Sequence, residues 1–211
     1  MKKIFTELKK EIQPHFKLDG SHGFDHTERV FNMAIRLATK EKADINIVGI
    51  SALLHDVARS KEDKNNNICH AEEGAEMAKI ILEKYNLSED KIKNIVHCIK
   101  AHRYSKRIKP ETKEAKIIQD ADRLDAIGAI CIARVFGYSG KRDKPFHVSS
   151  IKPKTKYSGE SETSINHFFE KILKIKPEGF HTKMARNIAK KRYKFTKDFV
   201  DRFLKEWEGK I

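Results

Sequence analysis

Apolar side chains recur every three or four residues along most of this 211-residue chain, and no stretch alternates apolar and polar residues long enough to predict a strand. Such spacing places the apolar side chains on one face of a helix. The sequence therefore predicts an all-α fold. The expected helices span residues 4–17, 25–40, 44–58, 70–85, 88–102, 111–136, 164–174 and 182–208.

Two polar stretches between these helices predict loops. Residues 59–69 include three consecutive asparagines, and residues 137–160 are rich in Gly, Ser, Pro and Lys. An irregular segment as long as the second is typical of a lid, a binding loop or disorder. We expect one domain over residues 1–211, with a core at about 20–136, a flexible basic loop at 137–160 and C-terminal helices at 161–211 packed on the core.

One apolar run, residues 51–58 (SALLHDVA), carries His55 and Asp56 side by side. Burying an imidazole and a carboxylate is costly unless both groups are satisfied. A divalent cation would satisfy both, because the imidazole offers a neutral nitrogen and the carboxylate an anionic oxygen. This interpretation requires matching ligands elsewhere in the chain.

Further polar side chains share faces with apolar residues. At about 100° per residue, His26, His70 and His102 each lie on the apolar side of their expected helix. Aspartates also interrupt the helix expected over residues 111–136, which is otherwise apolar or small nearly all round, and buried carboxylates need a partner such as a cation. Helical spacing does not decide which aspartate would bind a metal. These aspartates are Asp120, Asp122 and Asp125.

Two imidazoles and two carboxylates form a mixed nitrogen and oxygen ligand set. It suits Mn²⁺, Fe²⁺, Co²⁺, Ni²⁺ or Zn²⁺, with Mg²⁺ also compatible. For His70 and His102 two interpretations stay open: they hold a second ion or contact a substrate phosphate, or they are core histidines bonded to the main chain. A single inward histidine is more often structural. Four of them beside Asp56 favour a site, because independent structural reasons would have to coincide.

The ordered pattern His26, His55-Asp56 and Asp122 resembles the HD-domain superfamily of metal-dependent phosphohydrolases. Three local strings carry the resemblance: residues 22–30 (HGFDHTERV), 54–57 (LHDV) and 121–124 (ADRL). Residues 119–129 (QDADRLDAIGA) and 163–171 (TSINHFFEK) are similar to the small bacterial and archaeal HD hydrolases. The resemblance thus spans roughly residues 20–208.

The resemblance implies an HD-domain helical bundle with a C-terminal helical extension. It implies that His26, His55, Asp56 and Asp122 bind the metal and that Asp56 also orients the attacking water. The remaining expectations concern residues with alternative structural roles. Arg123, Lys171 and Arg192 are candidate phosphate contacts, with a solvated helix face as the alternative for Lys171 and Arg192, and His22, Asp120 and Asp125 are candidate neighbours of the ligands.

The net charge of +14 favours an anionic partner, although lysine-rich solvated surfaces account for part of the excess. Together with the resemblance, it predicts a phosphorylated small molecule, with nucleotides as the leading class and cleavage of nucleoside triphosphates to monophosphate and diphosphate as the leading reaction. A non-catalytic module that binds a nucleotide or nucleic acid on the same helical fold is the alternative.

Features of the whole chain predict a cytoplasmic protein with no membrane partner. The three cysteines are odd in number and fall mostly within expected helices, which favours reduced thiols. The N-terminal residues become charged too early for a signal peptide, and no apolar run reaches membrane-spanning length. The oligomeric state is left open.

Overall fold

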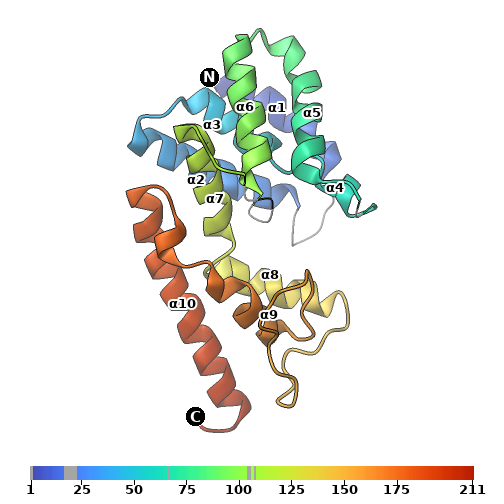
Figure 1. Cartoon of the computed structure of the whole chain (residues 1–211), viewed down its shortest axis with the longest axis vertical. Helices are drawn as coiled ribbons and strands as arrows, with labels where there is room; N and C mark the ends of the chain where they lie inside the picture. Colours follow the sequence, from blue (N-terminus) through green and yellow to red (C-terminus); the bar gives the residue numbers. More distant parts are fainter. Residues whose placement is uncertain (1, 17–22, 66, 104–105, 107) are drawn as a thin grey trace. The chain divides into compact units, whose positions relative to one another are not determined.

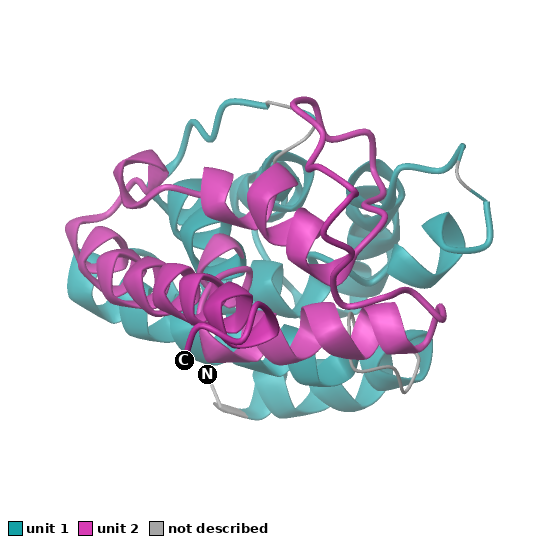
Figure 2. Ribbon diagram, turned by 90° about the horizontal axis from the view of Figure 1, so that it is seen from below, with its two compact units in different colours: residues 1–122 teal, residues 123–211 magenta. Residues whose placement is uncertain are grey.

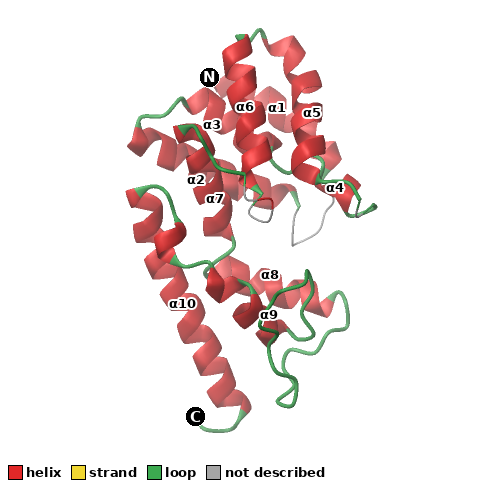
Figure 3. Ribbon diagram, in the orientation of Figure 1, coloured by secondary structure: helices red, strands yellow, loops and turns green. Residues whose placement is uncertain are grey.

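The computed structural model describes residues 2–16, 23–65, 67–103, 106 and 108–211, and its regular secondary structure is helical, with no strand among these residues (Figures 1 and 3). The all-α prediction is confirmed. The chain divides into two compact units, residues 1–122 and 123–211 (Figure 2). The single-domain organisation with a core at about 20–136 stays a prediction. Within the described part of the chain, no helix is both long and apolar enough to cross a bilayer.

Unit 1 is built around the helix α3, Ile45–Leu54, whose residues from Ile47 to Leu54 are all buried. A helix buried on every side is expected to be apolar all round, as this one is. Other helices of the unit pack against α3. They are α1 (Lys2–Ile12), α2 (Phe24–Glu41), α5 (His70–Leu82) and α6 (Glu89–His102).

The close approach of α1 to α3 depends on Gly49. A Cβ atom at this position would lie 2.5 Å from the ring of Phe5 on α1. Phe5 also packs edge-on against Phe31 of α2, with ring centroids 5.2 Å apart. Leu8 and Ile12 complete the buried face of α1, so this helix is held by apolar packing on the core of unit 1.

The helix α3 begins where the sequence predicts and ends earlier. Asp44 is its N-cap, and its carboxylate accepts the main-chain N–H groups of Asn46 and Ile47 at 2.8 and 3.2 Å. The helix ends at Leu54 rather than near residue 58, because tighter main-chain bonds follow, such as that from the N–H of Val57 to the carbonyl of Leu54. A short helix, α4 (Arg59–Glu62), lies within the stretch predicted as a loop at 59–69.

The long helix predicted over residues 111–136 is wrong. Two helices occupy this stretch: α7, Lys113–Asp125, and α8, Ala129–Gly140. The break falls at Gly128, whose φ of 95° is unfavourable for residues with a side chain. The N–H of Gly128 donates to Oγ1 of Thr196 at 2.8 Å instead of continuing the helical ladder.

Unit 2 is held together by aromatic side chains. It contains α8, α9 (Ser164–Glu170) and α10 (Lys183–Trp207). Phe136 of α8 lies 6.1 Å from Phe168 of α9 and 5.9 and 5.8 Å from Phe199 and Phe203 of α10, measured between ring centroids. A single phenylalanine thus contacts both neighbouring helices.

The irregular segment between α8 and α9 is bonded to α9. The main-chain N–H groups of Ser164 and Ile165 donate to the carbonyls of Pro145 and Phe146 at 3.1 and 3.0 Å. The N–H of Lys154 donates to the carboxylate of Glu170 at 2.9 Å. The flexibility of residues 137–160 stays a prediction, and the helix α8 occupies the first four of these residues.

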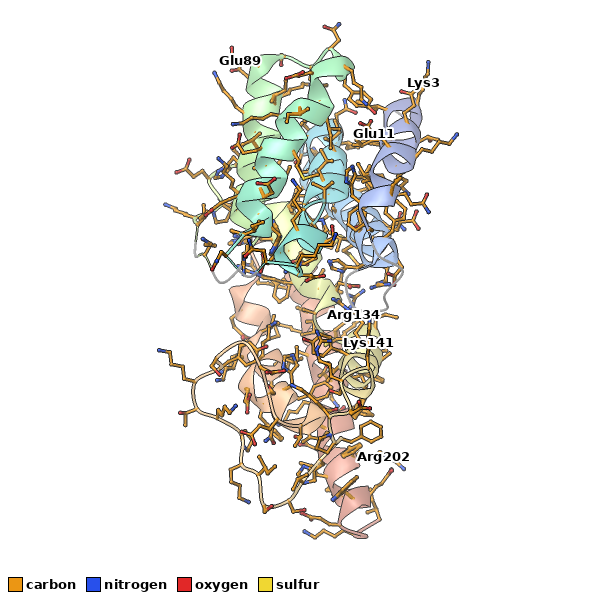
Figure 4. All side chains as sticks on the ribbon, turned by 90° about the vertical axis from the view of Figure 1, so that its right-hand side faces the viewer. Lys3, Glu11, Glu89, Arg134, Lys141 and Arg202 are labelled. Carbon is orange, nitrogen blue, oxygen red and sulfur yellow. The ribbon has the colours of Figure 1, made fainter. Side chains whose placement is uncertain are left out.

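The excess of positive charge is concentrated in unit 2. Residues 123–211 contain 21 lysines and arginines against 10 acidic residues, whereas residues 1–122 contain 23 against 20. Charged side chains such as Lys3 and Glu89 project from the surface of unit 1, and Arg202 projects from unit 2 (Figure 4). The unit that carries His55-Asp56 is therefore close to neutral, so the total charge says little about the ligand of that site.

Candidate metal centre

Four imidazoles converge on Asp56 in the interior of unit 1. His26 lies near the start of α2, His55 directly follows α3, His70 begins α5 and His102 ends α6. No more than 3% of any of these histidines, or of Asp56, is exposed. Each imidazole comes from a different part of the sequence, so the fold itself assembles the cluster.

The carboxylate of Asp56 divides the histidines into two groups. Its Oδ2 atom lies 3.8 Å from Nε2 of His26 and 3.8 Å from Nε2 of His55. Its Oδ1 atom lies 3.4 Å from Nε2 of His70 and 3.6 Å from Nε2 of His102. Two sets of three ligands, His26–His55–Asp56 and Asp56–His70–His102, therefore share one carboxylate.

Hydrogen bonds on the outer side of the rings fix two of the tautomers. Nδ1 of His55 donates to the carbonyl of Ala52 at 2.7 Å, and Nδ1 of His102 donates to the carbonyl of Ile99 at 2.6 Å. Because the proton of each neutral ring is held on Nδ1, the lone pair is on Nε2 and faces Asp56. Both rings are thus oriented as metal ligands rather than as hydrogen-bond donors to the carboxylate.

His70 is oriented by a side chain instead. Its Nδ1 atom donates to Oε2 of Glu62 at 2.5 Å, and its main-chain N–H donates to the same oxygen at 2.8 Å. Glu62 in turn accepts two hydrogen bonds from the guanidinium of Arg103, both 2.9 Å long. The Nε2 lone pair of His70 therefore also faces Asp56.

The spacing of the ligand atoms fits a metal ion. The Nε2 atoms of His26 and His55 lie 3.3 Å apart, and those of His70 and His102 also lie 3.3 Å apart. Two ligand atoms about 2.1 Å from one ion lie about 3.0 Å apart at a right angle and about 3.4 Å apart at a tetrahedral angle. Buried Oδ1 of Asp56 has no hydrogen-bond partner among the described residues. The inward-facing atoms of this cluster offer lone pairs and few protons, and a bound cation would satisfy them.

The protonation states suit this role. Burial lowers the pKa of His55 and of His70 to about 4, so both rings are neutral near pH 7. Burial by itself would raise the pKa of Asp56, but the charges of Arg59 and His55 outweigh it and hold the pKa well below its usual range. Neutral imidazoles around an ionised carboxylate are the forms that bind metals.

Asp122 lies beside the first of these two sets. Its Oδ1 atom lies 3.5 Å from Nε2 of His26, and its side chain is 30% exposed. Burial of its carboxyl group opposes ionisation, but the hydrogen bond with His26 and the charges of the histidines lower its pKa below the usual range. Asp120 is fully buried. The geometry thus favours Asp122 over Asp120 as the metal ligand, an assignment that stays a prediction.

The other predicted residues have partners of their own. Arg123 donates to the carbonyl of Gly179 at 3.1 Å, and Arg192 donates to the carbonyl of Leu124 at 2.5 Å. The remaining two are Asp125, which pairs with Arg134 at 2.7 Å, and Lys171, whose ammonium lies 5.4 Å from the ring centroid of Tyr157. His22 lies outside the described residues. Roles for these residues in binding substrate or supporting the ligands stay predictions.

Three residues beside the cluster were not expected from the sequence: Glu62, Arg103 and Arg59. Glu62 is eight residues before His70 in a polar stretch predicted as a loop, and Arg103 directly follows His102. Polar residues in such positions are usually solvated. The sequence places Glu62 and Arg103 near candidate ligands, but charged residues are common enough that such nearness by itself predicts no contact.

Comparison with known proteins gives the family. Residues 23–127 match the model of the HD domain. Protein YpgQ of Bacillus subtilis, which is uncharacterized, is 30% identical over 192 residues, covering 89% of this chain and 85% of YpgQ. The chain belongs to the HD-domain superfamily. The family match begins just before His26 and ends after Asp122, so it includes the whole cluster.

Solved structures of HD proteins share the fold over nearly the whole chain. A crystal structure of an HD-superfamily hydrolase from Bacillus thuringiensis is 32% identical, with a TM-score of 0.77 and coverage of 98% of both chains. The structure of Bacillus subtilis YpgQ in complex with ADP is 26% identical, with a TM-score of 0.72 and coverage of 97% of this chain and 94% of YpgQ. This HD protein is therefore a hydrolase, and its His and Asp cluster is typical of an HD metal site.

Proposed function

We propose that this HD protein is a metal-dependent nucleotide phosphohydrolase that splits nucleoside triphosphates into monophosphate and diphosphate. The observation that carries the proposal is the buried cluster in which imidazole Nε2 atoms surround the carboxylate of Asp56. Support for a nucleotide comes from the solved complex of the related YpgQ with ADP.

The cluster has the ligands for a divalent ion. His26, His55, Asp56 and Asp122 would hold a first ion, and Asp56, His70 and His102 offer a second set of ligands. A bound divalent ion lowers the pKa of a coordinated water and stabilises charge on phosphoryl oxygens. The surrounding protein keeps the rings neutral and the carboxylates ionised, as the pKa shifts of His55, His70 and Asp56 indicate.

Arg59 is suited to hold a phosphate of the substrate. Its terminal nitrogens lie 3.5 Å from Oδ1 of Asp56 and 3.9 Å from Oε1 of Glu62, too far for hydrogen bonds. Its buried Nε has no hydrogen-bond partner within the described chain. A guanidinium with unused donors beside the cluster matches the planar, multiple hydrogen bonding that phosphate oxygens accept.

The reaction consumes one water. Its oxygen bonds to the α-phosphorus and loses a proton to solvent, the bond from that phosphorus to the oxygen bridging to the β-phosphorus breaks, and diphosphate leaves with that bridging oxygen. Asp56 and its histidines would hold the reacting groups in place, and Arg59 would hold the charged phosphate chain. Positioning and charge stabilisation of this kind account for most of the catalysis in phosphoryl transfer.

The test is a screen of the purified protein with nucleoside mono-, di- and triphosphates in the presence of Mn²⁺, Mg²⁺, Co²⁺ or Ni²⁺. Diphosphate release is expected from triphosphates, and in ¹⁸O-labelled water the label is expected in the monophosphate. His55→Ala and Asp56→Ala are expected to be inactive. A protein that hydrolyses no nucleotide, but binds nucleic acid with steep salt dependence and is unaffected by these changes, would contradict the proposal and support the binding module.

A further inference from the structure

We propose that Glu62, held by Arg103, is the positioning residue that makes His70 a metal ligand, so that a second ion site in this cluster is controlled separately from the first. This inference rests on the proposed metal-dependent function. It assigns a role to two residues outside the ligand set, and it predicts that the two ion sites respond differently to one substitution.

Four hydrogen bonds of Glu62 support this role. One carboxylate oxygen accepts both the main-chain N–H and Nδ1 of His70. Arg103 donates one hydrogen bond to each oxygen of the same carboxylate, at 2.9 Å. The Glu62 side chain is only 17% exposed. A carboxylate held at four points orients the His70 ring with little freedom to rotate.

The position of His70 in its helix explains why a side chain is needed. His55 and His102 each donate from Nδ1 to the carbonyl three positions earlier, which belongs to the helix that ends just before His55 or at His102. His70 is the first residue of α5, so no preceding turn of this helix exists to offer such a carbonyl. Glu62, on the preceding short helix α4, supplies the missing acceptor.

The contacts of Glu62 also show why substituting it should affect only the ion site at His70 and His102. Among the described residues, Glu62 contacts His70, Arg103 and, at 3.9 Å, Arg59. The outer nitrogen of His55, in the first set of ligands, is anchored to Ala52 instead. Weakening the Glu62 anchor should therefore lower affinity for the ion held by His70 and His102 and leave the ion beside His26 and His55 unchanged.

The chain provides a matched control. Glu73 on α5 also links to α4, through an ion pair with Lys61 at 2.5 Å, and its side chain is 38% exposed. Glu62→Gln and Glu73→Gln therefore remove the same charge and weaken a link between the same two helices. Only the first substitution touches a histidine of the cluster.

The experiment is a titration of the metal-free full chain with Mn²⁺ and Co²⁺, with ion stoichiometry and affinities from calorimetry and the Co²⁺ absorption spectrum as a report on ligand geometry. The wild type and Glu73→Gln are expected to bind two ions. In Glu62→Gln one ion, the one assigned to His70 and His102, should bind about 10–100-fold less tightly, with the other unchanged, as for other outer partners of metal ligands. His70→Ala should bind one ion.

Four outcomes overturn the inference. A wild-type protein that binds one ion contradicts it and leaves the proposed hydrolase intact, whereas a wild type that binds none contradicts both. Equal affinities in Glu62→Gln and Glu73→Gln would show that the carboxylate does not position His70. Loss of both ions in Glu62→Gln would show that the sites are not separately controlled.

Discussion

The imidazole of His55 donates from Nδ1 to the carbonyl oxygen of Ala52, 2.7 Å away and one turn earlier. The last carbonyls of a helix lack partners within the helix, so the end of α3 offers an acceptor where one is needed. The bond keeps the proton on the outer nitrogen and leaves the inner lone pair toward Asp56. His102 uses the end of α6 in the same way.

Binding of a metal ion should stabilise the protein through this arrangement. At an ion concentration 100 times Kd, binding contributes about 2.7 kcal/mol to the free energy of unfolding, and for a chain of this size each kcal/mol raises Tm by about 2–4 °C. We expect a chelator to remove this stabilisation from the wild type, as measured by differential scanning calorimetry. Asp56→Ala, which removes the carboxylate common to both sets of candidate ligands, should show no difference between chelator and Mn²⁺. An equal response in both proteins would argue that the ion binds elsewhere.

Arg59→Gln tests the phosphate contact. Because this guanidinium makes no hydrogen bond to the described residues, its loss should leave the candidate metal ligands in place. The variants are compared at saturating metal, because the charge of Arg59 also acts on Asp56. A charge-assisted hydrogen bond contributes about 1.5–3 kcal/mol, so kcat/KM for a nucleotide should fall by about 10–100-fold. Arg36→Gln, at an exposed position of α2, is the control for loss of a positive charge. Equal kinetics for the two variants would remove Arg59 from the substrate site.

His167 predicts a pH dependence of stability in unit 2. Burial and the charge of Lys171 lower its pKa to about 4, although Glu170 acts in the opposite direction. The unfolded state, with a histidine pKa of about 6.5, binds more protons than the folded state between these values. The free energy of unfolding contributed by this group is therefore complete above pH 6.5 and is lost as pH falls toward 4.

Urea unfolding followed between pH 7 and 4.5 checks this prediction. His167→Gln keeps a polar group that can bond to Ser161, whose Oγ lies 3.2 Å from Nδ1 of the histidine. The variant should lose less stability on acidification than the wild type. Parallel pH profiles for the two proteins would show that His167 titrates alike in the folded and unfolded states.

Gly49→Ala should destabilise unit 1. The added Cβ would lie 2.5 Å from the ring of Phe5, so α1 must move or the ring must leave its rotamer. Overpacking of this kind costs about 1–3 kcal/mol. Gly137→Ala, within α8, meets nothing within 4 Å and should stabilise the helix by about 0.5–1 kcal/mol. Thermal unfolding of both variants gives the comparison, and similar shifts would contradict the close approach of α1.

The sequence by itself determined the helical class, most helix boundaries and the inward position of the four histidines that lie around Asp56. Helical spacing placed His26, His70 and His102 on inward faces, and the helix expected from residue 44 begins at Ile45, with Asp44 as its N-cap. These features are local: a periodicity of 3.6 residues and a capping side chain act within a few turns. Because His55 and Asp56 lie in an apolar run, few partners can meet the hydrogen-bonding and charge requirements of their side chains.

The tertiary structure decided what depends on contacts between distant residues. The break at Gly128 rests on packing against Arg192, whose side chain would lie 3.1 Å from an added Cβ, and on the bond to Thr196. The contact between Asp122 and His26 favours Asp122 over Asp120 as the predicted metal ligand, a choice that helical spacing could not make. Glu62, at the end of α4, and Arg103, just after α6, meet beside His70 only in the folded chain. Such bonds depend on distances in the folded chain, which no periodicity encodes.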